Sequence, residues 1–123
     1  MNWKFTGDRP VYHQIMEAIH GAVLSGQLKP GQRVPSVREL ASEAKVNPNT
    51  MQRALTELER EGLLVGGGTN GRTVTTDEAV LAAKKQAALE ALAKDCAAKF
   101  KSFGVTPKQA AQLLLELETE MEE

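Results

Sequence analysis

The sequence has a single cysteine, Cys96, and only five aromatic residues among its 123 positions. One cysteine excludes an intramolecular disulfide and is typical of a reducing compartment. With so few rings, the core must be built from Leu, Val, Ile, Ala and Met, and an aromatic-lined ligand site is not expected. No apolar run approaches the ~20 residues that cross a bilayer, and no signal peptide opens the chain. We therefore expect a soluble cytoplasmic protein without a membrane partner.

Arginine is missing from the last 47 residues of the chain. Residues 1–76 carry three Lys and six Arg against seven acidic residues, a net charge of +2, whereas residues 77–123 carry six Lys against nine acidic residues, a net charge of −3. The formal total of −1 argues against a protein that coats nucleic acid or anionic membranes through bulk positive charge. The contrast instead predicts two regions, 1–76 and 77–123, with different surfaces.

Residue patterns typical of enzymes are also missing. The sequence shows no paired carboxylates on a shared helix face, no nucleophile with a base and no cofactor fingerprint, so we expect neither an enzyme nor a cofactor. His13 and His20 can share a helix face, with Glu17 between them, but no further residues complete a recognisable metal-ligand set. The glycines at 66–68 lack the Gly-Lys-Ser/Thr of a phosphate-binding loop. We interpret them as part of a hairpin loop.

Apolar residues recur with the three-and-four spacing of amphipathic helices in the first part of the chain. The helices predicted there cover residues 11–25, 36–45 and 48–61. Ser36 and Glu39 form a capping-box pair at the start of the second helix. Asn47 is expected to cap the third helix, with Pro48 at its first position. The β-prone runs on either side of GGGTNGR predict a hairpin over 63–76.

Two further amphipathic helices are predicted after the hairpin, starting at Asp77 and at Thr106. They cannot bury both apolar stripes by folding on each other alone, so a second copy of the chain is the expected partner. The residues expected at this dimer interface are Leu81, Leu89, Leu92, Cys96, Phe100, Leu113, Leu114 and Leu117. A small-molecule effector, if one binds, is expected in a cavity lined by Ala and Leu between these two helices.

The third predicted helix has a polar outward face. If its apolar residues face inward, the residues left outside are Asn49, Gln52, Arg53, Thr56 and Arg60, with Thr50 beside them. A solvated surface helix shows the same pattern, so the stripe alone leaves both interpretations open. Three helices followed by a hairpin, however, are typical of a winged helix-turn-helix, whose recognition helix enters the DNA major groove. There, Asn and Gln pair with adenine, and Arg pairs with guanine or phosphate.

The runs PVYHQI, GQLKPGQRVPSVRELA and VNPNTMQRALTELEREGLL follow one another over about residues 10 to 76. In this order and spacing they closely resemble the N-terminal domain of GntR-type bacterial transcription regulators. The short helical tail resembles the YtrA-like branch, which dimerises through its two helices. The resemblance implies a mainly α fold with a small β-hairpin, namely a winged helix-turn-helix over 1–76 and two dimerisation helices over 77–123.

The resemblance also implies a function. It is that of a homodimeric regulator, expected to be a repressor, which binds an inverted-repeat DNA operator. The recognition helix over 48–61 would lie in the major groove and the wing over 66–72 near the backbone or minor groove. The alternative is a winged-helix module for protein or RNA contact, with the C-terminal helices as a docking arm. Preference for a palindromic duplex over RNA would separate the two.

Individual residues match the family's DNA contacts. Arg38 matches an arginine that contacts the operator, and Ser36 caps its helix close to the DNA backbone. All DNA-contacting candidates are Ser36, Arg38, Asn47, Asn49, Thr50, Gln52, Arg53, Asn70, Gly71 and Arg72. The sequence departs from the family at Pro48, where relatives often carry a DNA-contacting side chain, and in a wing whose only cation is Arg72.

Overall fold

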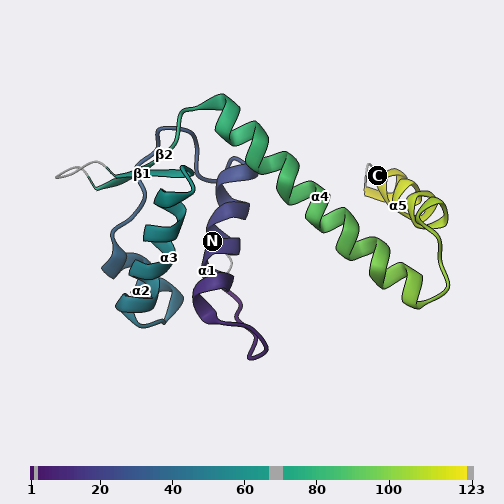
Figure 1. The fold of residues 1–123 in the computed structure, drawn as a ribbon, viewed down its shortest axis with the longest axis horizontal. Helices are drawn as coiled ribbons and strands as arrows, with labels where there is room; N and C mark the ends of the chain where they lie inside the picture. Colours follow the sequence, from purple (N-terminus) through teal and green to yellow (C-terminus); the bar gives the residue numbers. More distant parts are fainter. Residues whose placement is uncertain (2, 67–70, 122–123) are drawn as a thin grey trace. The chain divides into compact units, whose positions relative to one another are not determined.

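The computed structural model describes residues 1, 3–66 and 71–121. Its elements, in chain order, are α1 (Val11–Leu24), α2 (Val37–Ala44), α3 (Pro48–Arg60), β1 (Leu64–Gly66), β2 (Arg72–Val74), α4 (Glu78–Ser102) and α5 (Pro107–Met121). The helices and the hairpin predicted from the sequence are therefore confirmed, and so is the mainly α fold class. Figure 1 shows the three N-terminal helices grouped together, with the antiparallel β1–β2 hairpin beyond the C-terminal end of α3.

The hydrophobic core of this N-terminal part lies between its three helices and the hairpin. Helix α3 packs against both α1 and α2, because its inward residues repeat at the spacing of one helix face. The inward residues of α3 are Met51, Ala54, Leu55 and Leu58, all buried. Leu64 and Val74 face each other across the hairpin and are also buried. Each large side chain buried in this way stabilises the fold by about 1.5–3 kcal/mol.

Side-chain caps fix where the helices begin. Ser36 Oγ accepts a hydrogen bond from Glu39 N at 3.1 Å, and Asn47 Oδ1 accepts one from Asn49 N at 2.7 Å. These bonds satisfy backbone donors that have no partner within a helix. Lys45 ends α2 in the left-handed conformation, with φ 59° and ψ 48°, and so turns the chain sharply toward α3. Ser36 and Asn47 thus cap α2 and α3, as the sequence predicted.

The chain divides into two compact units, residues 1–84 and 85–123. This division falls within α4 and not after Thr76, because Leu81 of the first α4 turns packs against the core of the N-terminal unit. In the second unit, Thr106 and Gln109 form a reciprocal capping box at the start of α5, with N···O distances of 2.9 and 3.2 Å. Across the described ranges, no helix has the length and apolar character needed to cross a membrane.

Candidate nucleic-acid interface

The N-terminal half of α3 presents polar side chains to solvent. Asn49, Gln52 and Arg53 are exposed, and Thr50 is half-buried. The Gln52 amide donates to Thr56 Oγ1 at 3.2 Å, one turn further along the same face. Exposed amides of this length can form two hydrogen bonds with the edge of an adenine in the major groove. The structure therefore brings together the residues of α3 that the sequence proposed as base contacts.

Helix α1 supports one of these side chains. The guanidinium carbon of Arg53 lies 3.7 Å from the centre of the Tyr12 ring, a cation–π contact that restricts the arginine side chain. Tyr12 in turn stacks on His13, with 4.2 Å between the ring centres. Tyr12 was not among the residues singled out from the sequence. Its role depends on α1 and α3 packing together, which no local pattern reveals.

Helix α2 contributes a second cation beside the recognition helix. Arg38 is exposed on α2, two residues after the Ser36 cap. Since α2 packs on α3, the helix-turn-helix is complete, with α3 in the position of the recognition helix. The sequence predicted this arrangement from three helices followed by a hairpin.

Asn47 provides a test of capping against DNA contact, because its carboxamide oxygen already caps α3. We expect Asn47→Ala to lower the free energy of unfolding by about 0.5–2 kcal/mol, since the cap is lost. Asn47→Asp keeps a capping oxygen and should keep the stability, yet its charge should weaken binding to DNA if residue 47 faces phosphate. Urea denaturation and titration with a duplex measure the two effects separately. Equal stability of Asn47→Ala and the parent protein would contradict the capping role.

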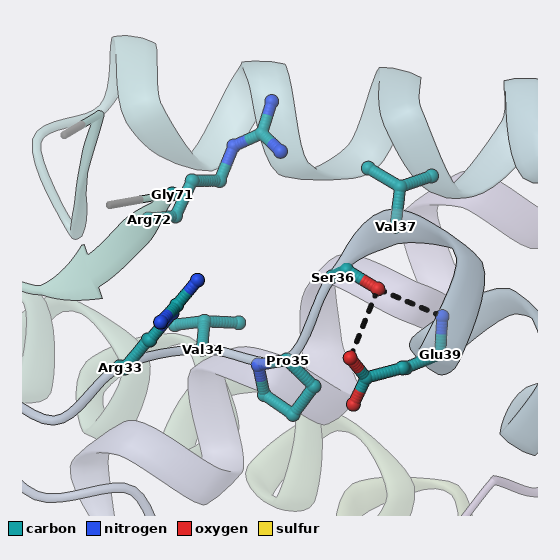
Figure 2. A pocket seen from close by; sticks show the side chains of 8 residues that line it. All are labelled: Arg33, Val34, Pro35, Ser36, Val37, Glu39, Gly71 and Arg72. Atoms are coloured by element: carbon teal, nitrogen blue, oxygen red, sulfur yellow. Dashed lines mark hydrogen bonds between the residues drawn. The ribbon is translucent and has the colours of Figure 1, made fainter. Parts of the chain in front are cut away.

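Two arginines lie at the base of the wing, where β2 begins. The segment 31–34 runs along the free edge of β2, with a bridge between Arg33 and Thr73 and a hydrogen bond from Val34 N to Arg72 O of 2.9 Å. A pocket of about 600 Å³ opens here between the wing and the first turn of α2 (Figure 2). Its lining residues are Arg33, Val34, Pro35, Ser36, Val37, Glu39, Gly71 and Arg72.

Arg33 is a second residue of the interface that was not predicted from the sequence. It lies in the connection between α1 and α2, 40 positions before its partner Thr73, so its place at the wing depends on a long-range pairing. The only local hint is the β-prone Val34 between turn residues. The wing base thus carries two cations, whereas the hairpin sequence contains only Arg72.

The Arg72 guanidinium is engaged within the protein. Its Nε donates a hydrogen bond to Glu59 Oε1 near the end of α3, and the two side chains form an ion pair. Gly71 precedes it with φ +71°, a conformation that favours glycine. The remaining wing candidate, Asn70, lies outside the described residues.

The two histidines of α1 have separate surroundings. His20 Nε2 lies 3.1 Å from Glu61 Oε2, which links α1 to the end of α3. His13 instead stacks on Tyr12. Over the described part of the chain, no group of three or more His, Cys, Asp or Glu side chains is placed to hold a metal ion.

The C-terminal helices leave most of their large apolar residues open to solvent. No α4 residue is buried, and within the described part of α5 only Ala110 is buried. The expected interface residues that are exposed are Leu89, Leu92, Leu113, Leu114 and Leu117. Cys96 and Phe100 are half-buried, while Leu81 packs against the N-terminal core instead.

A second pocket lies where α4 turns into α5. It has a volume of about 530 Å³, and its lining residues are Ala97, Ala98, Lys101, Gly104, Val105, Thr106 and Pro107. The sequence led us to expect a cavity lined by Ala and Leu between these helices. The pocket contains alanines but no leucine, and the leucines of α5 are each about half exposed.

The helix-turn-helix, the polar face of α3 and the adjoining hairpin define a winged helix-turn-helix domain. The family described as "Bacterial regulatory proteins, gntR family" matches residues 11–74, more than half of the chain. The protein belongs to the GntR family. The resemblance seen in the sequence is confirmed, and the N-terminal unit is the DNA-binding domain of a GntR-type transcriptional regulator.

Comparisons with known proteins agree with this assignment. The chain is 42% identical over 84 residues to the "HTH-type transcriptional repressor YtrA" of Bacillus subtilis, a match that covers 63% of this chain and 65% of that protein. A "GntR family transcriptional regulator from Listeria monocytogenes" has a TM-score of 0.83 at 27% identity, covering 91% of this chain and 98% of that one. The structure of "AraR(DBD) in complex with operator ORX1" has a TM-score of 0.56 at 28% identity. The match covers 61% of this chain and 96% of that one.

The matches to curated relatives are partial in length. The chain spans 53% and 65% of two curated relatives that it matches. The family and these relatives are transcriptional regulators and not enzymes, which agrees with the lack of catalytic motifs in the sequence.

Proposed function

We propose that this protein is a homodimeric transcriptional repressor that binds an inverted-repeat DNA operator. The observation that carries the proposal is the exposed polar end of α3, with Asn49 and Gln52 at its first turns and Arg38 on the adjacent α2. In a helix-turn-helix, this end of the recognition helix contacts base edges. The operator complex of AraR(DBD), a solved structure with the same fold, supports the same docking here.

Dimerisation is proposed from the apolar surface of α4 and α5. Leucines that are about half exposed, among them Leu113, Leu114 and Leu117, line one side of α5. Soluble monomers rarely expose contiguous apolar patches of this kind, and most oligomers of identical chains are symmetric dimers. Two-fold symmetry in the protein then requires two-fold symmetry in its site, with half-sites about one helical turn apart. Repression is proposed because the relative YtrA is named a repressor.

Selection from a library of random DNA duplexes tests the proposed function, because it identifies an operator from binding alone. We expect the full-length protein to enrich an inverted repeat whose half-sites are about one helical turn apart. The intergenic region next to the protein's own gene supplies a second set of candidate duplexes. Enrichment of no sequence, or tighter binding to structured RNA than to any duplex, would favour the alternative of a winged-helix module for RNA or protein contact.

A further inference from the structure

The alternation of side chains along β2 separates the two arginines at the base of the wing. Successive residues of a strand point to opposite faces. Arg72 shares its face with Val74, which is buried in the core. Arg33 pairs with Thr73 and therefore lies on the opposite face, where a Cβ added to Gly71 would be 3.8 Å from Arg33 Nε. Both cations line one pocket (Figure 2), although the strand places them on opposite faces.

On the inner face, Glu59 holds Arg72. The carboxylate of Glu59 accepts the bond from Arg72 Nε, and a Cβ added to Gly66, the cross-strand partner of Arg72, would lie 3.4 Å from Glu59 Oε2. From α3, Glu59 thus binds Arg72 of β2 and lies close to Gly66 of β1. The Arg72 side chain is only 19% exposed. Its Nε is bound to Glu59 and its charge is compensated within the protein, so a phosphate contact through its remaining N–H groups would contribute less than a contact to an unpaired guanidinium.

On the outer face, Arg33 is open to a ligand. Its side chain is exposed, and none of the ion pairs found among the described residues involves it. Its backbone is nevertheless held in place, because Val34 N donates to Arg72 O and Val74 N donates to Gln32 O, both at 2.9 Å. An exposed guanidinium on a fixed backbone suits a phosphate oxygen, which can accept two parallel hydrogen bonds from it.

We propose that Arg33 is the residue at the base of the wing that contacts a DNA backbone phosphate, and that Arg72 serves with Glu59 as a clamp between the wing and α3. The inference rests on the proposed DNA-binding function, which it extends by assigning the backbone contact to the α1–α2 connection. Phosphate contacts carry no sequence information, so Arg33 should contribute equally on specific and non-specific duplexes.

The salt dependence of DNA binding tests the assignment. Full-length Arg33→Ala and Arg33→Gln should each reduce the slope of log K against log salt by about 0.9 per protomer, on operator and on random duplex alike. Their affinity deficit relative to the parent should then shrink about eightfold per protomer, or about 60-fold for the bound dimer, for each tenfold rise in salt. Arg33→Lys should keep the slope. Lys29→Ala, which removes an exposed cation from the same connection outside the pocket, should leave the slope unchanged.

The clamp variants should behave differently. Arg72→Ala should lower the melting temperature while leaving the slope unchanged, whereas Glu59→Gln should release Arg72 and steepen the slope by up to about 0.9 per protomer. A slope that flattens in Arg72→Ala but not in the Arg33 variants would overturn the proposal. The proposal would also be overturned if neither Arg72→Ala nor the Arg33 variants changed the slope while the parent protein bound its selected operator. Failure of the parent to bind any duplex would instead refute the proposed function itself.

Discussion

Replacing Gln52 by alanine should lower affinity for the operator by about 1–3 kcal/mol per half-site, or about 5- to 150-fold, because a bidentate contact to a base is lost. The fold should survive, since Gln52 is exposed and its only side-chain partner among the described residues is Thr56 on the same helix. The loss should be confined to specific DNA. Operators altered at single base pairs should show relaxed discrimination at one position of each half-site.

Arg38→Ala should lower the affinity for the operator by a similar amount, because Arg38 is the exposed cation of α2 beside the recognition helix. Arg60→Ala provides a matched control. Arg60 is also an exposed arginine, but it lies at the last turn of α3 and pairs with Glu57 at 2.8 Å. Base contacts come from the N-terminal end of a recognition helix, so this change should have little effect on affinity.

Fluorescence anisotropy with the selected operator and with a scrambled duplex separates these outcomes, and thermal denaturation checks the fold. Operator affinity that is unchanged in both Gln52→Ala and Arg38→Ala would refute the assignment of α2 and α3 as the reading elements. An equal loss on operator and scrambled DNA would show that the residue contacts phosphate and does not read bases.

The helix boundaries could be predicted because their causes are local. The Ser36 and Asn47 caps depend on residues within three positions, and the inward face of α3 follows from apolar spacing alone. The polar end of α3 could be predicted in the same way, because residues outside the apolar face of a helix are left exposed. For these features, a short stretch of chain contains both interacting partners.

The contacts that hold the interface side chains could not be predicted, because their partners are distant in sequence. Arg53 lies against Tyr12 of α1, and Arg33 lies beside β2. Each contact depends on how whole elements pack. The sequence shows that Arg72 is present. It does not show that the Arg72 guanidinium already forms an ion pair with Glu59. Charge counted along the hairpin therefore gave an incomplete description of the wing.

Removing residues 85–123 should lower the apparent affinity for the full inverted repeat by about 10²- to 10⁴-fold, because binding of the second half-site is no longer intramolecular. The cut follows Lys84 so that Leu81 remains packed against the N-terminal core. This fragment should be a folded monomer, and it should bind an isolated half-site about as well as one head of the intact protein does. Sedimentation velocity and operator titration measure the two effects.

Single substitutions on α5 test dimerisation in the full-length chain. Leu117 lies within the apolar stripe formed with Leu113 and Leu114, whereas Leu115 points about 150° away around the helix. Leu117 and Leu115 are exposed to a similar extent, 50% and 57% respectively. Leu117→Glu should therefore dissociate the dimer and reproduce the affinity loss of the fragment, because it would place a charge in an apolar interface. Leu115→Glu should leave both the dimer and the affinity intact. A parent protein that is monomeric at micromolar concentration, or equal behaviour of the two variants, would show that this stripe does not join the two heads.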